Sequence, residues 1–121
     1  MLSTKLCIII FIITRFIIND YGQEITLYDH SYVIDLTANN YQENVVNKSF
    51  ISIIEIYSHN CGYCKLFAPK YIEFAKNIKD WHLIVRLFAI NCAQNGNVCK
   101  KINYDSTVPK LIAFWIGANR Y

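Results

Sequence analysis

Two cysteines separated by two residues, Cys61 and Cys64, form the part of this sequence best suited to do chemistry. An apolar stripe at helical spacing follows them, so the pair stands at a helix N-terminus, where free amides and the helix dipole stabilise a thiolate. A thiolate attacks disulfides, and a second thiol one helical turn away can resolve the mixed disulfide. We therefore expect Cys61 to be the exposed nucleophile and Cys64 the more buried resolving thiol.

Other uses of the pair fit its spacing less well. A structural disulfide there would close a very small ring and constrain little of the unfolded chain. A structural zinc ion needs four ligands, and the next two cysteines, Cys92 and Cys99, do not repeat the two-residue spacing. The three histidines follow no ligand pattern and are expected at the surface or in packing: His30, His59 and His82. Electrostatic tuning of the thiolate is an alternative role for His59 alone. The sequence thus indicates a redox pair and no metal site.

A lone carboxylate, Glu55, lies in the apolar segment 50–57, which ends shortly before the cysteine pair. Burial in such a segment would raise the pKa of Glu55 towards neutrality. The carboxylate could then take the proton from Cys64 as that thiol attacks, so we expect Glu55 to be a proton acceptor. The alternative is that Glu55 faces solvent from the edge of a strand.

A second pair of cysteines, Cys92 and Cys99, brackets a short polar loop. Four cysteines follow residue 22, and their spacing suggests two local pairings. We expect a structural disulfide between Cys92 and Cys99, and the alternatives are two free thiols or a second redox pair.

The segments that must position these residues alternate between strand-like and helix-like patterns. Strands are expected where β-branched, aromatic and other apolar residues gather, at 33–36, 50–57, 83–90 and 111–116. Helices are expected over 40–47, from the cysteine pair to residue 78, and over 94–101. This order predicts an α/β domain whose central mixed sheet carries helices on both faces.

Two local features refine the expected helices. Asn40 and Glu43 have the residue types of a capping box, in which each side chain binds a free amide at the helix start. Pro69 falls inside the helix that follows the cysteines and is expected to kink it.

The bulk composition limits the functions to consider. The chain has 121 residues, of which 54% are hydrophobic, enough for one domain with a core but not for two. Its net charge is +3, and no basic stripe with interleaved aromatic residues is present, which argues against nucleic-acid binding. No repeat, low-complexity tract or linker divides the chain.

Residues 1–22 are expected to be a secretory signal peptide. Lys5 precedes an apolar run over 6–13, which is the arrangement of such signals. Arg15 interrupts the apolar stretch, so no stable membrane span is expected. An uncleaved anchor and an ordinary buried strand are the alternatives.

Cleavage of this segment would agree with the cysteine content of the chain. It would remove Cys7 and leave an even number of cysteines, which an oxidising compartment can hold as disulfides. Asn47, followed by Lys48 and Ser49, is a candidate glycosylation site of the kind found on surface loops of secreted proteins. We therefore expect the protein in the lumen of the endoplasmic reticulum or Golgi, or outside the cell.

Short blocks of this sequence resemble the active-site region of the thioredoxin superfamily, in its secretory branch that includes protein disulfide isomerases. They are Glu55-Ile56-Tyr57-Ser58, Cys61-Gly62-Tyr63-Cys64-Lys65 and Phe67-Ala68-Pro69. Three further blocks are similar to the N-terminal thioredoxin domain of quiescin sulfhydryl oxidase: Leu27-Tyr28-Asp29, Lys79-Asp80-Trp81, and Asn91-Cys92-Ala93 with Cys99. The resemblance covers roughly residues 25 to 116 and implies a thioredoxin-like fold.

The resemblance also implies roles for individual residues. In that family, a proline at the position of Pro109 is cis and faces the cysteines, and the backbone at Val108 pairs with the client chain. The last two cysteines, Cys92 and Cys99 here, form a structural disulfide in the family.

For function, the resemblance implies a thiol–disulfide oxidoreductase of the secretory pathway that acts on client proteins. The family's thioredoxin domain oxidises client dithiols and passes the electrons to a second cysteine pair beside FAD in a helical domain, which reduces oxygen to peroxide. This chain then needs no cofactor of its own, and the FAD-binding helical domain is its partner. The alternatives are a free-standing disulfide isomerase or reductase and a non-catalytic client-binding or vestigial domain.

The chain departs from the family pattern in several places. Asn60 replaces the usual Trp, Tyr63 the usual His between the cysteines, and Lys110 the usual Thr. A positive His makes the disulfide more oxidising, which Tyr63 cannot do, so the direction of electron flow stays open. The pattern also continues beyond residue 121, so we expect residues 23–121 to form an incomplete domain that lacks the last strand and helix.

Overall fold

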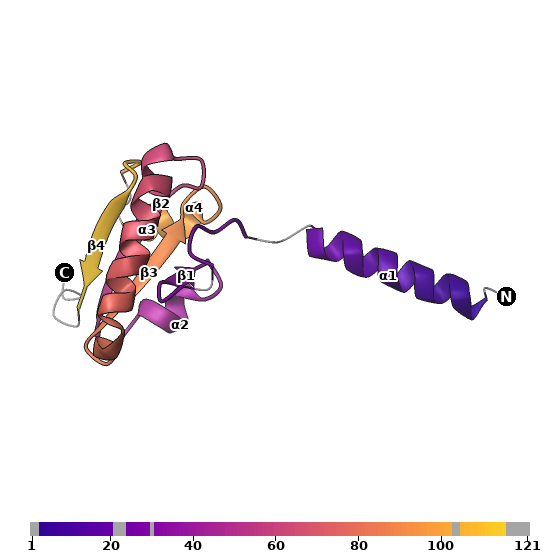
Figure 1. Ribbon diagram of the computed structural model, residues 1–121, viewed down its shortest axis with the longest axis horizontal. Coiled ribbons are helices and arrows are strands. Elements are labelled where there is room, and N and C mark those ends of the chain that lie inside the picture. The colour runs from indigo at the N-terminus through magenta and orange to yellow at the C-terminus, as the bar shows by residue number, and fades with distance from the viewer. Residues whose placement is uncertain (1–2, 21–23, 30, 103–104, 116–121) are drawn as a thin grey trace.

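The structure, a computed structural model, describes residues 3–20, 24–29, 31–102 and 105–115 (Figure 1). Its elements follow one another as α1 (Thr4–Asp20), β1 (Ile34–Leu36), α2 (Tyr41–Val45), β2 (Ile51–Tyr57), α3 (Gly62–Asn77), the 3₁₀ helix η1 (Lys79–Trp81), β3 (Val85–Asn91), α4 (Gly96–Lys101) and β4 (Lys110–Phe114). From β1 onwards, strands and helices alternate, which confirms the predicted α/β class.

The strands form one mixed sheet in the order β1-β3-β2-β4. β3 pairs in parallel with both β1 and β2, whereas β4 runs antiparallel to β2. β2 is nearly continuous in β-branched and aromatic residues, as suits a strand that lies between two others and is buried on both faces. In the register, Ile54 lies between Phe88 and Ile112.

Side chains of β2 alternate between two hydrophobic clusters on opposite faces of the sheet. Ile54 and Ile56 pack in the cluster that includes side chains of α2 and α4. Tyr57 packs in the other cluster with side chains of α3, which runs along this face of the sheet in Figure 1. Helices therefore cover both faces, as predicted. By the same alternation Glu55 points to the face that α3 covers.

The predicted capping box at the start of α2 is wrong. Asn40 does precede the helix, but its Oδ1 accepts the N–H of Thr37 at 2.8 Å. Its Nδ2 donates to the carbonyl of Asp35 at 3.0 Å. Because the side chain fastens the turn before the helix, it makes no capping bond to the helix amides.

The predicted boundaries differ from the observed ones chiefly at β3. The strand expected from residue 83 begins at Val85, and Leu83 and Ile84 are apolar but exposed. The N–H of Ile84 donates to the carbonyl of Trp81 at 2.8 Å, so the chain is still turning after η1 at these positions. α3 passes through Pro69 and ends at Asn77. The predicted end of the last strand, residue 116, lies outside the described residues.

The apolar N-terminal run forms α1, which lies apart from the sheet in Figure 1. Large apolar side chains in its first part, such as Ile8 and Phe11, are exposed. The alternative of a buried strand is therefore not what the structure shows. Within the described part of the chain, no helix has both the length and the apolar character that crossing a membrane requires.

Candidate active site

The topology of the sheet brings three distant segments to one edge. β2 and β3 are parallel and Tyr57 lies opposite Asn91, so the segments that follow both strands start at the same edge. β4 is antiparallel to β2 and its first residue, Lys110, lies opposite Ile56. Pro109, which precedes β4, therefore lies at the same edge as the loop that leads to the cysteine pair.

Cys61 is the N-cap residue of α3 and is half-buried. Its Sγ accepts the N–H of Cys64 at 3.1 Å, so the sulfur lies among the free amides of the first helical turn. Such amides and the helix dipole stabilise negative charge on the sulfur. Both cysteines are free thiols, so the pair is in its dithiol form.

The loop before β4 faces this sulfur. The peptide bond between Val108 and Pro109 is cis, and Cys61 Sγ lies 3.9 Å from the carbonyl oxygen of Val108, to which the thiol donates. Lys110, which departs from the family pattern, pairs with Asp105 at 2.9 Å. Thr107 donates its hydroxyl to Asp105 at 2.6 Å, and these bonds hold the pKa of Asp105 well below its usual range. The loop is thus fastened by its own polar residues.

Cys64 is fully buried between α3 and the sheet, in the cluster that includes Tyr57. Burial, then the hydrogen bond with Cys61, and to a smaller extent the charge of Glu55 raise the pKa of Cys64 to about 11. At neutral pH this thiol therefore keeps its proton, and it needs a proton acceptor before it can attack a disulfide.

Glu55 is fully buried in the middle of β2 rather than facing solvent. The hydroxyl of Tyr28 donates to Oε2 of this carboxyl, while Oε1 has no hydrogen-bond partner among the described residues. Burial raises the pKa of Glu55 to about 7, and the bond from Tyr28 opposes the rise. The carboxyl can thus gain or lose a proton near neutral pH, and its charge acts on Cys64.

The raised pKa of Glu55 predicts a pH-dependent stability that a Glu55→Gln variant lacks. Glu55 binds a proton more tightly in the folded chain, so its contribution to stability is full below pH 4.5 and is lost as the pH rises through about 7. We expect the variant to gain about 1–3 kcal/mol in free energy of unfolding, relative to the wild type, between pH 4.5 and pH 8. Urea unfolding of both proteins at the two pH values measures this difference. A constant difference would show that Glu55 titrates normally.

The second pair, Cys92 and Cys99, is joined by a disulfide with an S–S distance of 1.94 Å and a Cα–Cα distance of 5.9 Å. It connects the end of β3 to α4. Cys99 is buried in the cluster on the face opposite α3, whereas Cys64 belongs to the cluster beneath α3. The structure therefore separates the two pairs by the thickness of the sheet.

Two buried polar residues at the site, Tyr28 and Asn91, were not predicted as site residues, although both lie in short blocks that resemble the sulfhydryl oxidase domain. The side-chain amide of Asn91 donates to the carbonyl of Ile25 at 2.9 Å and lies 2.8 Å from Nδ1 of His59. It thereby ties the segment before β1 to the loop that leads to Cys61. The signals that could have found the two residues are their places in those blocks and, for Asn91, a polar residue at the end of an apolar strand; neither signal identifies their partners.

Other residues lie away from this edge. Asn47 is exposed and follows α2 with a φ of 56°, which Asn tolerates better than most residues.

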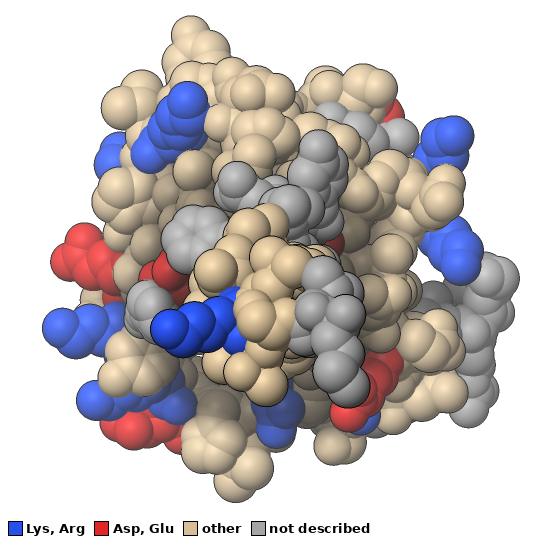
Figure 2. All heavy atoms as spheres, turned by 90° about the vertical axis from the view of Figure 1, so that its right-hand side faces the viewer, with Lys and Arg blue, Asp and Glu red and all other residues tan. Residues whose placement is uncertain are grey.

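No group of three or more His, Cys, Asp and Glu side chains among the described residues could hold a metal ion. On the face shown in Figure 2, basic and acidic side chains are interspersed, without a continuous field of one charge.

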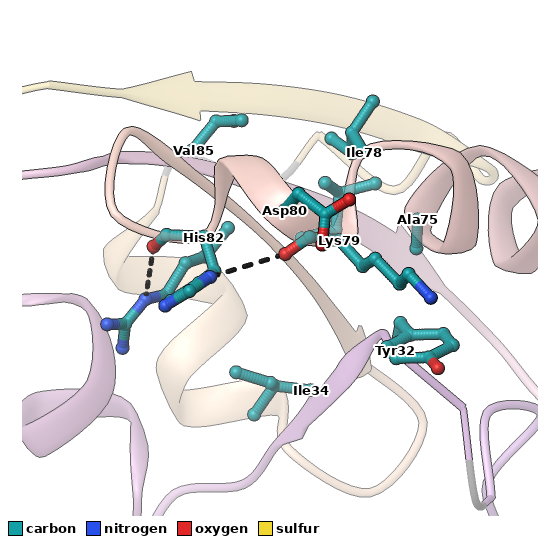
Figure 3. A pocket seen from close by; sticks show the side chains of 10 residues that line it. Tyr32, Ile34, Ala75, Ile78, Lys79, Asp80, His82 and Val85 are labelled. Carbon is teal, nitrogen blue, oxygen red and sulfur yellow. Dashed lines mark hydrogen bonds between the residues drawn. The ribbon is translucent and has the colours of Figure 1, made fainter.

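A hollow of about 550 Å³ lies near the end of α3 and the start of β3 (Figure 3). Ala75 and Ile78 line it from the helix side, Val85 from the strand, and Tyr32 and Lys79 at its rim. Since Cys61 stands at the start of α3, the hollow is at the opposite end of that helix. The hollow therefore takes no part in the chemistry of the cysteines.

Comparison with known proteins agrees with this geometry. The thioredoxin family model matches residues 32–120. A Dictyostelium discoideum protein named as a protein disulfide-isomerase is 35% identical over 90 residues, which is 68% of this chain and 21% of that protein. Sulfhydryl oxidase 1 of Cavia porcellus is 37% identical over 70 residues, 56% of this chain and 11% of that protein. The matches thus span only about a fifth or less of these relatives.

A crystal structure of a thioredoxin domain of ERdj5 has a similar fold. It superposes with a TM-score of 0.62 at 26% identity, covering 70% of this chain and 71% of that domain. The likeness confirms the predicted thioredoxin-like arrangement of a mixed sheet flanked by helices.

Proposed function

The chain belongs to the thioredoxin family and is homologous to domains of protein disulfide-isomerases and sulfhydryl oxidases, and from this premise we propose that it oxidises client dithiols through Cys61 and Cys64. One observation carries the proposal. A half-buried thiol at the N-terminus of α3 accepts the backbone N–H of a fully buried thiol, Cys64, and the buried carboxyl of Glu55 lies on the same face of the sheet and acts on Cys64 through its charge.

The proposed reaction starts from a disulfide between Cys61 and Cys64. A client thiolate attacks the sulfur of Cys61, the disulfide breaks, and Cys64 leaves as a thiolate that takes a proton from Glu55. A second client thiol loses its proton and attacks the client sulfur of the mixed disulfide, which releases Cys61. The client loses two electrons and two protons, and the pair ends as the dithiol. Reversal of the same steps reduces or isomerises a client disulfide.

The client chain is proposed to lie along the loop before β4. The carbonyl of Val108 faces Cys61 Sγ at 3.9 Å, so backbone pairing there would bring a client sulfur close to the nucleophile. Two large side chains beside the pair, Tyr63 and Leu66, are 78% and 71% exposed and could contact an apolar client segment.

Within this proposal the domain acts as the thioredoxin unit of a flavin-linked sulfhydryl oxidase. The hollow in Figure 3 is at the end of α3 away from Cys61, so a flavin held there would not meet the cysteines. That hollow therefore does not suit a flavin that must react with the pair, and in this proposal the FAD binds to a separate helical domain with its own cysteine pair. The second candidate, an isomerase or reductase, is favoured by the identity to a protein named as a protein disulfide-isomerase.

We further propose that residues 1–22 are a signal peptide and that residues 23–121 are the thioredoxin-like domain of a secretory-pathway protein. The exposed apolar side chains over residues 8–13 of α1 support the first part, since they do not pack against the sheet. The disulfide between Cys92 and Cys99 and the exposed sequon at Asn47 are compatible with an oxidising compartment.

Two assays of the full chain test the proposed activity and its direction. Both are run in a glutathione buffer: oxidation of reduced ribonuclease and reduction of insulin. Faster oxidation than reduction favours the oxidase role, and the reverse favours the isomerase or reductase. Rates equal to those of the buffer alone in both assays would leave only the non-catalytic, client-binding domain.

A Glu55→Gln variant should slow the step in which Cys64 resolves the mixed disulfide. Gln cannot accept a proton, so we expect resolution at pH 7 to fall about 10²-fold, while the attack by Cys61 changes less. Quenched-flow mixing of the dithiol form with oxidised glutathione, followed by mass spectrometry, separates the two steps. An unchanged rate of resolution would show that Glu55 has only a structural role.

A further inference from the structure

Tyr28 lies in the segment before β1, outside the sheet, yet it is only 2% exposed. Its ring meets those of Tyr57 and Tyr71 edge to face, with centroids 5.4 Å and 5.9 Å apart. Such contacts on two sides hold the ring in one orientation. Its hydroxyl is thereby aimed at Glu55, to whose Oε2 it donates.

The neighbouring tyrosines cannot substitute for Tyr28 in this contact. The hydroxyl of Tyr71 lies 3.1 Å from both the carbonyl of Ile53 and that of Phe88, so it is engaged by the backbone. The hydroxyl of Tyr57 is directed to other groups, 3.5 Å from oxygens of both Thr26 and Asp35. Among the described residues, Tyr28 is the one that donates a hydrogen bond to the carboxyl.

We infer that Tyr28 is the positioning residue of the proton acceptor: it holds Oε2 of Glu55 and leaves Oε1 as the atom that exchanges a proton with Cys64. Oε1 is buried and has no hydrogen-bond partner among the described residues. In the neutral carboxyl this arrangement favours a proton on Oε1, because the unprotonated oxygen is the better acceptor for the hydroxyl of Tyr28 on Oε2. Burial, followed by the bond to Glu55, raises the pKa of Tyr28, so this hydroxyl remains a donor throughout.

This inference rests on the proposed function and specifies where the proton goes. As the mixed disulfide between Cys61 and the client is resolved, the proton of Cys64 moves from its sulfur to Oε1 of Glu55. The Cys64 sulfur then bonds to that of Cys61, and the client sulfur leaves with the electron pair of the broken bond. The bond from Tyr28 favours the ionised carboxyl, which keeps Glu55 able to accept this proton at neutral pH.

A Tyr28→Phe variant of the full chain removes this bond while keeping the ring. The carboxylate then loses a charge-assisted hydrogen bond, so the midpoint of the pH profile for resolution should rise by about one unit or more. At pH 7 resolution should slow about fivefold or more, and at pH 9 it should return close to the wild-type rate. The measurement is quenched-flow mixing of the dithiol form with oxidised glutathione from pH 5 to pH 9.

Tyr71→Phe is the matched control, because it removes a hydroxyl from the same aromatic cluster that is hydrogen-bonded to backbone carbonyls and not to Glu55. We expect its midpoint to equal that of the wild type. A Tyr28→Phe profile with the wild-type midpoint, or a slower rate at every pH, would overturn the role of Tyr28 and leave the proposed function standing. A wild type that forms no mixed disulfide at Cys61 would instead contradict the proposed function itself.

A second measurement covers the case in which Tyr28→Phe does not fold. In wild-type protein labelled with ¹³C, the carboxyl carbon of Glu55 and the Cζ carbon of Tyr28 are followed by NMR as the pH is raised. Because the two groups share a hydrogen bond, both resonances should move with one midpoint. A Tyr28 resonance that stays constant while Glu55 ionises would overturn the inference.

Discussion

Replacing Cys61 with serine should abolish disulfide exchange, lowering the rate of insulin reduction by about 10³-fold or more. Only a thiolate attacks a disulfide at a useful rate, and a serine hydroxyl is not ionised at neutral pH. Within the α/β domain no other described thiol is open to attack a client, because Cys64 is fully buried and the disulfide joins Cys92 to Cys99. The rate is measured with the full chain in a glutathione buffer at pH 7.

Cys7→Ser is the control for this variant, since Cys7 is an exposed free cysteine in α1, away from the sheet. It should retain the wild-type rate. Cys61 is not the nucleophile if the Cys61→Ser variant reduces insulin as fast as the wild type. Loss of activity in Cys7→Ser would contradict the assignment equally.

The second large effect is expected from Cys64→Ala, which should trap clients on Cys61. The first attack needs only the half-buried sulfur of Cys61 at the helix N-terminus, whereas release of a bound client by the domain itself needs the second thiol. We expect turnover to fall about 10²-fold or more and a covalent complex with the client to accumulate. Alanine is preferred to serine here because a hydroxyl would be buried without a partner.

The covalent complex is detected on a non-reducing gel and mapped by mass spectrometry. The double variant Cys61→Ser with Cys64→Ala should trap nothing, which distinguishes attack by Cys61 from exchange at other thiols. Rapid turnover by Cys64→Ala, with no complex, would mean that Cys64 does not resolve the mixed disulfide.

The features of the site that were predictable from the sequence are those that lie close together along the chain. The cysteine pair and its helix are adjacent, so their geometry follows from the first helical turn. Glu55 lies in the strand that ends just before the pair, and an apolar strand in the centre of a sheet implies a buried carboxyl. The alternation of strands and helices likewise depends on local patterns and yielded the α/β class.

The remaining features depend on contacts between distant segments. Tyr28 is 27 residues from Glu55 in sequence, in a segment without periodicity, and only packing against Tyr57 and Tyr71 sets its direction. Asn91 likewise joins segments far apart in sequence. The error at Asn40 has a related cause: its side chain had two competing sets of amide and carbonyl partners, and the turn before α2 bound it more favourably than the helix start.

The central claim, that Cys61 and Cys64 form the redox-active pair, is tested most directly by a redox equilibrium. The full chain is equilibrated with glutathione mixtures from fully reduced to fully oxidised, quenched with an alkylating agent and mapped by mass spectrometry. We predict that Cys61 and Cys64 pass together from alkylated thiols to a disulfide, while Cys92 and Cys99 remain bonded to each other. The account would be contradicted if Cys61 and Cys64 stayed as thiols in every mixture and only Cys92 and Cys99 changed their state.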